Sequence, residues 1–231
     1  MFNLKIARRL GIAHRYDHFV RPFTTALKNI RLKLRNNPKI VVIGFNKTGT
    51  TSLFYALEEL GYKMSNQHDF ERLYNSYKQG EIKIEGILKK INQYEVFQDI
   101  PFSLPGFYKN VDNNFPNSKY ILTIRSESDI WFKSFEKYYG DLEKIKNDEY
   151  IEEGFLYRTF RDAYNSEELI KDDCTGVYEK HIADVMTYFK SKKDRLLVID
   201  VSEEKSYLEL CSFLNKKPIR QNFQWKNKTK A

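Results

Sequence analysis

Residues 44–52 carry side chains whose types and spacing suit the binding of a phosphate group. The segment reads Gly44-Phe-Asn-Lys47-Thr-Gly49-Thr-Thr-Ser52. Its spacing follows the nucleotide-binding loop G-x-x-x-x-G-K-[ST], but Thr50 stands at the lysine position and the lysine is instead Lys47. In a nucleoside-triphosphate enzyme that lysine contacts the β- and γ-phosphates, a task that Thr50 cannot perform. The segment therefore predicts a loop for a different phosphate group.

The flanking residues predict how this loop is held. Residues 40–43 are apolar without alternation, as in a parallel strand covered on both faces, and residues 52–60 show helical spacing. We therefore expect a helix N-terminus at residues 49–52, where backbone amides carry a partial positive charge and point at one anion. Gly49 lets the backbone approach that anion closely, and four hydroxyl donors surround it: Thr48, Thr50, Thr51 and Ser52.

The loop resembles the 5'-phosphosulfate loop of sulfotransferases that use 3'-phosphoadenosine 5'-phosphosulfate (PAPS), written G-x-P-[KR]-[ST]-G-T-[ST]-[ST]. Asn46 stands where the family commonly has proline, which should loosen the turn slightly without touching the donors. The resemblance implies a P-loop-like sulfotransferase fold, PAPS as co-substrate and no metal. It assigns the cofactor contacts of this loop to Lys47, Thr48, Gly49, Thr50, Thr51 and Ser52.

A second element of the family is a strand that ends in an arginine, with a serine on the next helix, and together they hold the 3'-phosphate. Residues 119–124 match the strand, Arg125 follows it, and Ser134 stands nine places further on. The planar fork of Arg125 can donate two parallel hydrogen bonds to a phosphate. Because this spacing is one longer than in many members, Ser126 and Ser128 are alternative hydroxyl ligands.

The short apolar strand at residues 96–98 ends at Asp99. In cytosolic sulfotransferases the corresponding stretch ends in the catalytic histidine, and some carbohydrate-acting relatives use a glutamate as the base. A partly desolvated aspartate has a raised pKa, which suits it to accept a hydroxyl proton. Our hypothesis is that Asp99 is the general base. The alternative is that Asp99 caps the turn before Pro101.

The end of the chain matches the family more weakly. Residues 195–200 read as a late strand and residues 207–214 as a helix, and a basic segment follows. Relatives carry a basic tail that folds over the cofactor, so the resemblance suggests Lys226 and Asn227 as further phosphate ligands. A solvated, lysine-rich terminus is the alternative.

The order of elements predicts an α/β fold with a parallel sheet flanked by helices on both faces. Gly49, Asp99 and Arg125 each follow the end of a predicted strand, so they should meet at one edge of the sheet, where ligands bind in such folds. A chain of 231 residues with 41% hydrophobic content fits one such domain. We assign residues 39–231 to this PAPS-binding domain and residues 1–38 to a basic helical extension.

Positive charge is concentrated in that extension. The first 40 residues hold ten Lys or Arg and one Asp, a net charge of +9, while the whole chain carries +8. Residues 22–35 read as an amphipathic helix. A basic amphipathic arm can lie on an anionic membrane surface, and it can equally dock on its own domain or on a neighbouring subunit. Nucleic acid is not an expected partner, because the aromatics show no interleaved basic pattern beyond the arm.

Two cysteines, Cys174 and Cys211, and no apparent signal peptide predict a reducing compartment with buried thiols. No apolar stretch approaches the length of a membrane span. We therefore expect a cytoplasmic protein whose contact with a membrane, through residues 1–38, is peripheral. His14 and His18 lack further ligands, so we expect no metal site.

The resemblance thus predicts transfer of a sulfuryl group from PAPS to a hydroxyl or amine of an acceptor, such as a carbohydrate or a lipid-linked glycan. The loops that would select this acceptor, residues 64–91 and 138–174, carry no recognisable signature. Two alternatives remain open. One is a P-loop kinase or NTPase in which Asp200 holds a metal, and the other is a non-catalytic nucleotide-binding protein whose basic arm binds a membrane or a partner.

Overall fold

The computed structural model describes residues 38–224, so all of the predicted extension except Pro38 lies outside the described residues, as do Lys226 and Asn227. The described elements are, in chain order, β1 (Ile40–Val42), α4 (Thr50–Glu59), α5 (Gln67–Lys78), α6 (Ile84–Ile91), β2 (Val96–Phe97), α7 (Phe107–Asn114), β3 (Lys119–Thr123), α8 (Ser128–Tyr139), α9 (Leu142–Lys146), α10 (Phe155–Tyr164), α11 (Lys171–Tyr188), the 3₁₀ turn η2 (Lys193–Arg195), β4 (Leu196–Ile199) and α12 (Ser206–Phe213).

A parallel sheet of four strands organises these elements, in the order β2-β1-β3-β4. Ile40 of β1 pairs with Val96 of β2 and with Lys119 of β3, and Tyr120 of β3 pairs with Leu196 of β4. The chain leaves β1 toward one side to form β2 and then returns to the other side to form β3. In sheets of this kind the crevice beyond the carboxyl ends of two such central strands is the place where ligands bind.

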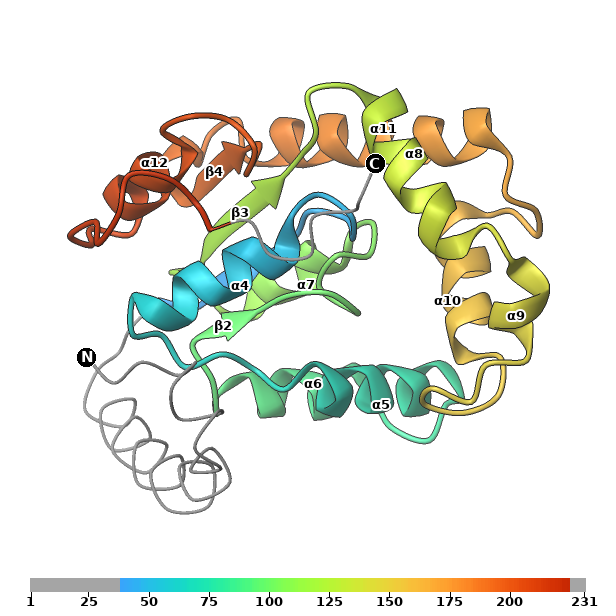
Figure 1. The fold of residues 1–231 in the computed structure, drawn as a ribbon. Helices are drawn as coiled ribbons and strands as arrows, with labels where there is room; N and C mark the ends of the chain where they lie inside the picture. Colours follow the sequence, from blue (N-terminus) through green and yellow to red (C-terminus); the bar gives the residue numbers. More distant parts are fainter. Residues whose placement is uncertain (1–37, 225–231) are drawn as a thin grey trace, which may run out of the picture. The chain divides into compact units, whose positions relative to one another are not determined.

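Helices cover both faces of the sheet, which explains why its strands are continuously apolar (Figure 1). One face of β1 and β3, through Ile40, Val42 and Ile121, packs against α4 and α12. The other face packs Val41 and Tyr120 against α5, α6, α7 and α11. The predicted α/β fold with helices on both faces of a parallel sheet is therefore confirmed.

A third apolar cluster joins helices α8, α9, α10 and α11, of which α8, α9 and α10 lie beside one another in Figure 1. The rings of Trp131 on α8 and Tyr178 on α11 stack with centroids 4.3 Å apart and planes within 5°. Phe45, from the loop after β1, is buried in the same cluster. The loop after β1 is therefore packed against a layer of helices whose position the sequence pattern did not predict. Helix α9 was not predicted.

The remaining structural expectations can be compared directly. The strands predicted at residues 40–43, 96–98, 119–124 and 195–200 are all present, each shorter than predicted by one or two residues. Cys174 and Cys211 are buried free thiols, as predicted. Within residues 38–224, no helix combines the length and the apolar character that crossing a bilayer requires.

We expect Gly44→Ala to destabilise the protein, because Gly44 lies directly against β3. A Cβ atom at this position would lie 2.6 Å from the Thr123 backbone nitrogen and closer still to its carbonyl and hydroxyl oxygens. Backbone atoms cannot swing aside, so the strands must separate, at a cost of about 1–3 kcal/mol or more. Urea unfolding followed by circular dichroism measures this loss.

The matched control for this substitution is Gly176→Ala. Gly176 lies inside α11, and an added Cβ there meets nothing within 4 Å. Replacing a helical glycine by alanine should raise stability by about 0.5–1 kcal/mol. Equal unfolding midpoints for Gly44→Ala and the unmodified protein would contradict the close packing of the loop on β3.

Candidate active site

The first turn of α4 forms the anion-binding end of the loop. Gly49 is the N-cap residue and has a φ of 94°, and a Cβ on it would lie 2.9 Å from the Val201 Cβ, so both conformation and space require glycine. The Leu53 amide donates to the Gly49 carbonyl, and α4 has no acidic side chain in its first turn. The backbone amides of residues 50–52 therefore give the N-terminus of α4 a partial positive charge. No carboxylate of the first turn lies beside them.

Thr50, Thr51 and Ser52 line the cavity in front of this turn, but the side chain of Thr48 does not. Thr48 is fully buried, and its hydroxyl bonds to the Phe45 carbonyl and, at 2.6 Å, to the Thr123 hydroxyl. The Thr48 hydroxyl is therefore engaged within the protein and is not turned to the cavity. Its side chain instead ties the loop to β3.

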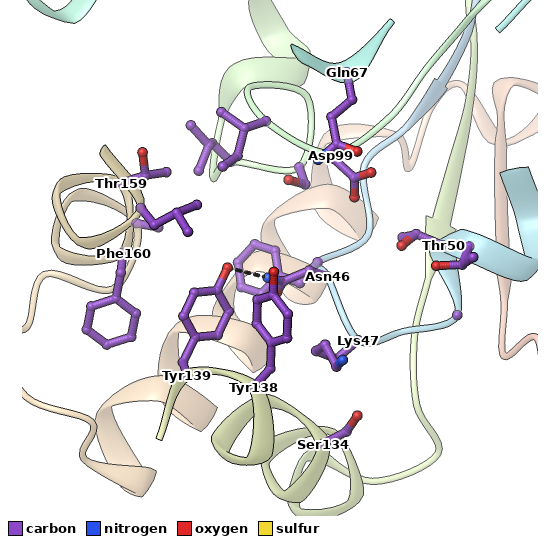
Figure 2. Close-up of a pocket in the computed structure, with 18 of the residues that line it drawn as sticks. Asn46, Lys47, Thr50, Gln67, Asp99, Ser134, Tyr138, Tyr139, Thr159 and Phe160 are labelled. Carbon is purple, nitrogen blue, oxygen red and sulfur yellow. Dashed lines mark hydrogen bonds between the residues drawn. The ribbon is translucent and has the colours of Figure 1, made fainter. Parts of the chain in front are cut away.

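Asn46 is held in place by two hydrogen bonds. Its side-chain amide donates to the Tyr139 hydroxyl at 2.8 Å (Figure 2). Its backbone carbonyl accepts from Trp131 Nε1 at 3.0 Å. Tertiary contacts thus supply the restraint that proline provides in most family members. The expected loosening of the turn is offset by α8.

Lys47 and Arg125 bring two cations to the loop. Lys47 has a left-handed backbone with a φ of 68°, and its carbonyl accepts from Arg125 Nε at 3.2 Å. The Lys47 ammonium lies 4.7 Å from the centroid of the Tyr138 ring. Burial and the charge of Arg125 lower the pKa of Lys47. This excess positive charge beside free helix amides defines a site for an anion.

Asp200, at the end of β4, holds Arg125 in this position. Its carboxylate lies 3.6 Å from Arg125 Nη1 and accepts hydrogen bonds from the Ser126 amide and from both the amide and hydroxyl of Ser202. The Arg125 amide donates in addition to the Tyr178 hydroxyl. Arg125 is therefore fixed by side chains from β4 and α11 as well as by the loop.

A cavity of about 700 Å³ joins this loop to Asp99. Figure 2 shows Asp99 and Gln67 on one side of it and Ser134 on another, with Lys47 and Tyr138 between them. The cavity is also lined by Gly49 and Arg125. The structure thus brings together Gly49, Asp99 and Arg125, the three positions expected to meet at one sheet edge.

Asp99 follows β2 in a left-handed conformation with a φ of 58°. Its Oδ2 atom accepts a hydrogen bond of 2.8 Å from the Gln98 side chain, whereas the Ser103 amide bonds to the Asp99 backbone carbonyl. The carboxylate is therefore turned to the cavity and does not cap the turn. Burial raises the pKa of Asp99 to about 6, and the nearby Glu71 carboxylate adds to the rise.

The three candidate serines differ in their surroundings. Ser134, on α8, lines the cavity. The Ser128 hydroxyl donates to Glu179 at 2.6 Å, and Ser126 is not among the cavity-lining residues. Of these hydroxyls, that of Ser134 is the one placed to meet a ligand. Lys226 and Asn227 lie outside the described residues and stay predictions.

Several cavity residues carry no sequence signal that could have identified them. Glu71, Tyr138, Asp148 and Tyr150 come from segments without a motif, and only the folded chain brings them to the cavity. His181, on α11, supports the loop from behind, since its Nε2 bonds to the Ile43 carbonyl at 2.8 Å.

Among residues 38–224, no three His, Cys, Asp or Glu side chains are grouped so that they could hold a metal ion. A helix N-terminus, two adjoining cations and a facing carboxylate thus lie at the carboxyl edge of a parallel α/β sheet, an arrangement that suits an anionic ligand. The sequence profile of the sulfotransferase domain family matches residues 39–231, so the chain belongs to this family. No curated protein matches the chain at a significant level.

Proposed function

We propose that the protein transfers a sulfuryl group from PAPS to a hydroxyl or amine of an acceptor. The observation that carries this proposal is the shared cavity of Lys47, Arg125 and Asp99, which places cations beside a helix N-terminus and a carboxylate facing them. Membership of the sulfotransferase domain family supports the type of reaction.

In the proposed step an acceptor oxygen or nitrogen forms a bond to sulfur while the bond from sulfur to the bridging oxygen of the 5'-phosphate breaks. The electron pair stays on the leaving phosphate, and the acceptor proton passes to Asp99. Lys47 and the amides of residues 50–52 stabilise the charge that builds on the bridging oxygen. A fixed cation at ~4 Å contributes on the order of 4 kcal/mol at an effective dielectric constant near 20.

The other phosphate would rest on Arg125 and Ser134. Arg125 is 20% exposed in its side chain, so its guanidinium can still reach a ligand while Asp200 holds it. A guanidinium held on one side by a carboxylate loses less freedom when it binds a phosphate, which strengthens the contact. In this proposal the product adenosine 3',5'-bisphosphate occupies the loop and Arg125 together.

A kinase or NTPase is less well supported. The Asp200 carboxylate, its metal-holding candidate, is already engaged by Arg125, Ser126 and Ser202. Thr50 also leaves the β- and γ-phosphates without the lysine that such enzymes use.

Titration calorimetry separates these functions. Adenosine 3',5'-bisphosphate should bind with EDTA present, and removal of the 3'-phosphate, as in AMP, should weaken binding about 10-fold or more because Arg125 loses its partner. Arg125→Gln should abolish most of this difference between the two nucleotides. Tight binding of ATP that requires magnesium, with no preference for the bisphosphate, would instead support the kinase or NTPase.

A further inference from the structure

Three carboxylates line the cavity, and the charges of all three act on the Tyr138 phenol. Glu71 comes from α5, Asp99 from the loop after β2, and Asp148 from the connection between α9 and α10. The Lys and Arg side chains that line the same cavity within residues 38–224 are Lys47 and Arg125, and Arg125 contacts the loop carbonyl of Lys47. The cavity is therefore divided into a cationic part at the phosphate loop and an acidic part beside Asp99.

Glu71 shows that the acidic part lacks a partner. The residue is 1% exposed, and its Oε1 atom accepts from the Gln67 side chain at 2.8 Å. Its buried Oε2 atom makes no close hydrogen bond within residues 38–224; the His68 ring nitrogen lies 3.5 Å away, and the Tyr150 hydroxyl interacts with the same carboxylate. A buried carboxylate oxygen without a donor is costly, and the cavity is the side from which a donor can come.

The carboxylates also act on one another and on nearby rings. Burial is the main cause of the raised pKa of Asp99 and of Tyr138; the charge of Glu71 adds to both shifts, and Asp99 and Asp148 add to that of Tyr138. Burial also raises the pKa of Glu71, and the charges of His68 and Arg72 offset only part of this rise. None of the three carboxylates forms an ion pair with a Lys or Arg of residues 38–224. A neutral polyol would donate hydrogen bonds but leave this repulsion in place, whereas a cation would remove it.

We propose that the acceptor carries a protonated amino group in addition to the hydroxyl that receives the sulfuryl group, and that Glu71 and Asp148 bind this ammonium. The inference rests on the proposed function, because it takes Asp99 as the general base and places the sulfuryl donor at Lys47. Tyr150, whose amide donates to Asp148 and whose side chain lines the cavity, adds an aromatic ring of the kind that attracts a cation. The acceptor class is thus a hydroxylated amine, of which a phenolic amine and an aminosugar are two kinds.

Three phenols that differ in the charge of one terminal group test this inference. Tyramine carries an ammonium, tyrosol carries a neutral hydroxyl, and 3-(4-hydroxyphenyl)propionate carries a carboxylate. Titration calorimetry is done on the full chain, with and without saturating adenosine 3',5'-bisphosphate. Tyramine should bind about 10-fold more tightly than tyrosol, a difference of about 1.4 kcal/mol, and the carboxylate compound should bind most weakly.

Substitutions then assign the preference to named side chains. Glu71→Gln, and separately the more exposed Asp148→Asn, should each remove most of the advantage of tyramine. Glu85→Gln, at an exposed position of α6 away from the cavity, is the control and should leave it unchanged. Asp148→Asn keeps the test valid if the buried Glu71→Gln variant does not fold.

Two results overturn the inference. Equal or weaker binding of tyramine compared with tyrosol, including no binding of either at millimolar concentration, contradicts an ammonium site. If tyramine still binds more tightly than tyrosol after each substitution, other residues cause the preference and the proposal is rejected. Failure to bind the bisphosphate would instead contradict the proposed function, while the nucleotide-free titrations would still report on the acidic part of the cavity.

Discussion

Lys47→Ala is expected to lower the rate of sulfuryl transfer by about 10²–10³-fold, the usual cost of removing one preformed group that stabilises developing charge. The Lys47 ammonium lies over the Tyr138 ring, 4.7 Å from its centroid. Burial and the charge of Arg125 lower its pKa, and no carboxylate is among the causes of this shift. The ammonium is therefore free to turn to the bridging oxygen as charge builds there. Single-turnover measurements with a chosen acceptor give this rate.

The affinity for adenosine 3',5'-bisphosphate should fall less than the rate, because Lys47 is most useful in the transition state. Lys47→Arg should recover part of the loss, since it restores a cation at the loop. Lys190→Ala, at an exposed position after α11, is the matched control. If Lys47→Ala keeps near-normal turnover with an unchanged melting temperature, Lys47 does not have this role.

Asp99→Asn should lower turnover by about 10²–10⁴-fold, the usual contribution of a general base, while nucleotide affinity is unchanged. Asparagine keeps the size of the side chain and an oxygen for the Gln98 amide, and it tolerates the left-handed backbone of this position. The substitution therefore removes the basic function with little effect on the fold. Asp172→Asn, at an exposed position of α11, is the control.

The pH dependence of the same variant gives a second readout. Asp99 must be ionised to accept a proton, and its pKa is raised to about 6. The value of kcat/KM should therefore rise with pH up to about 6 and then level off, falling about tenfold for each pH unit below it. In Asp99→Asn this acidic limb should disappear. A profile with the same limb in the variant would assign the titration to another group.

The sequence allowed much of the donor side of the site to be predicted, because local patterns determine it. An apolar run, a glycine-bracketed turn and a following helical period are enough to place Gly49 and residues 50–52 at a helix N-terminus. The meeting of Gly49, Asp99 and Arg125 also followed from sequence order, since parallel strands bring their carboxyl ends to one edge.

The role of Thr48 shows the limit of this reasoning. In the sequence its hydroxyl is indistinguishable from those of Thr50 and Thr51, yet it faces the sheet, because the loop turns its side chain toward Thr123 on β3. The direction of a loop side chain depends on which neighbouring strand packs against it. That neighbour lies 75 residues further along the chain.

The sequence by itself determined the family, the loop before α4 and the position of Asp99 after β2, because each is encoded by residues within a few positions of a strand end. Only the tertiary structure decided what surrounds them: the restraint of Asn46 by α8, the fixing of Arg125 by Asp200, and the acidic part of the cavity with Glu71 and Asp148. These contacts join segments far apart in the chain. Their partners are selected by how helices pack on the sheet, which no local pattern of residues specifies.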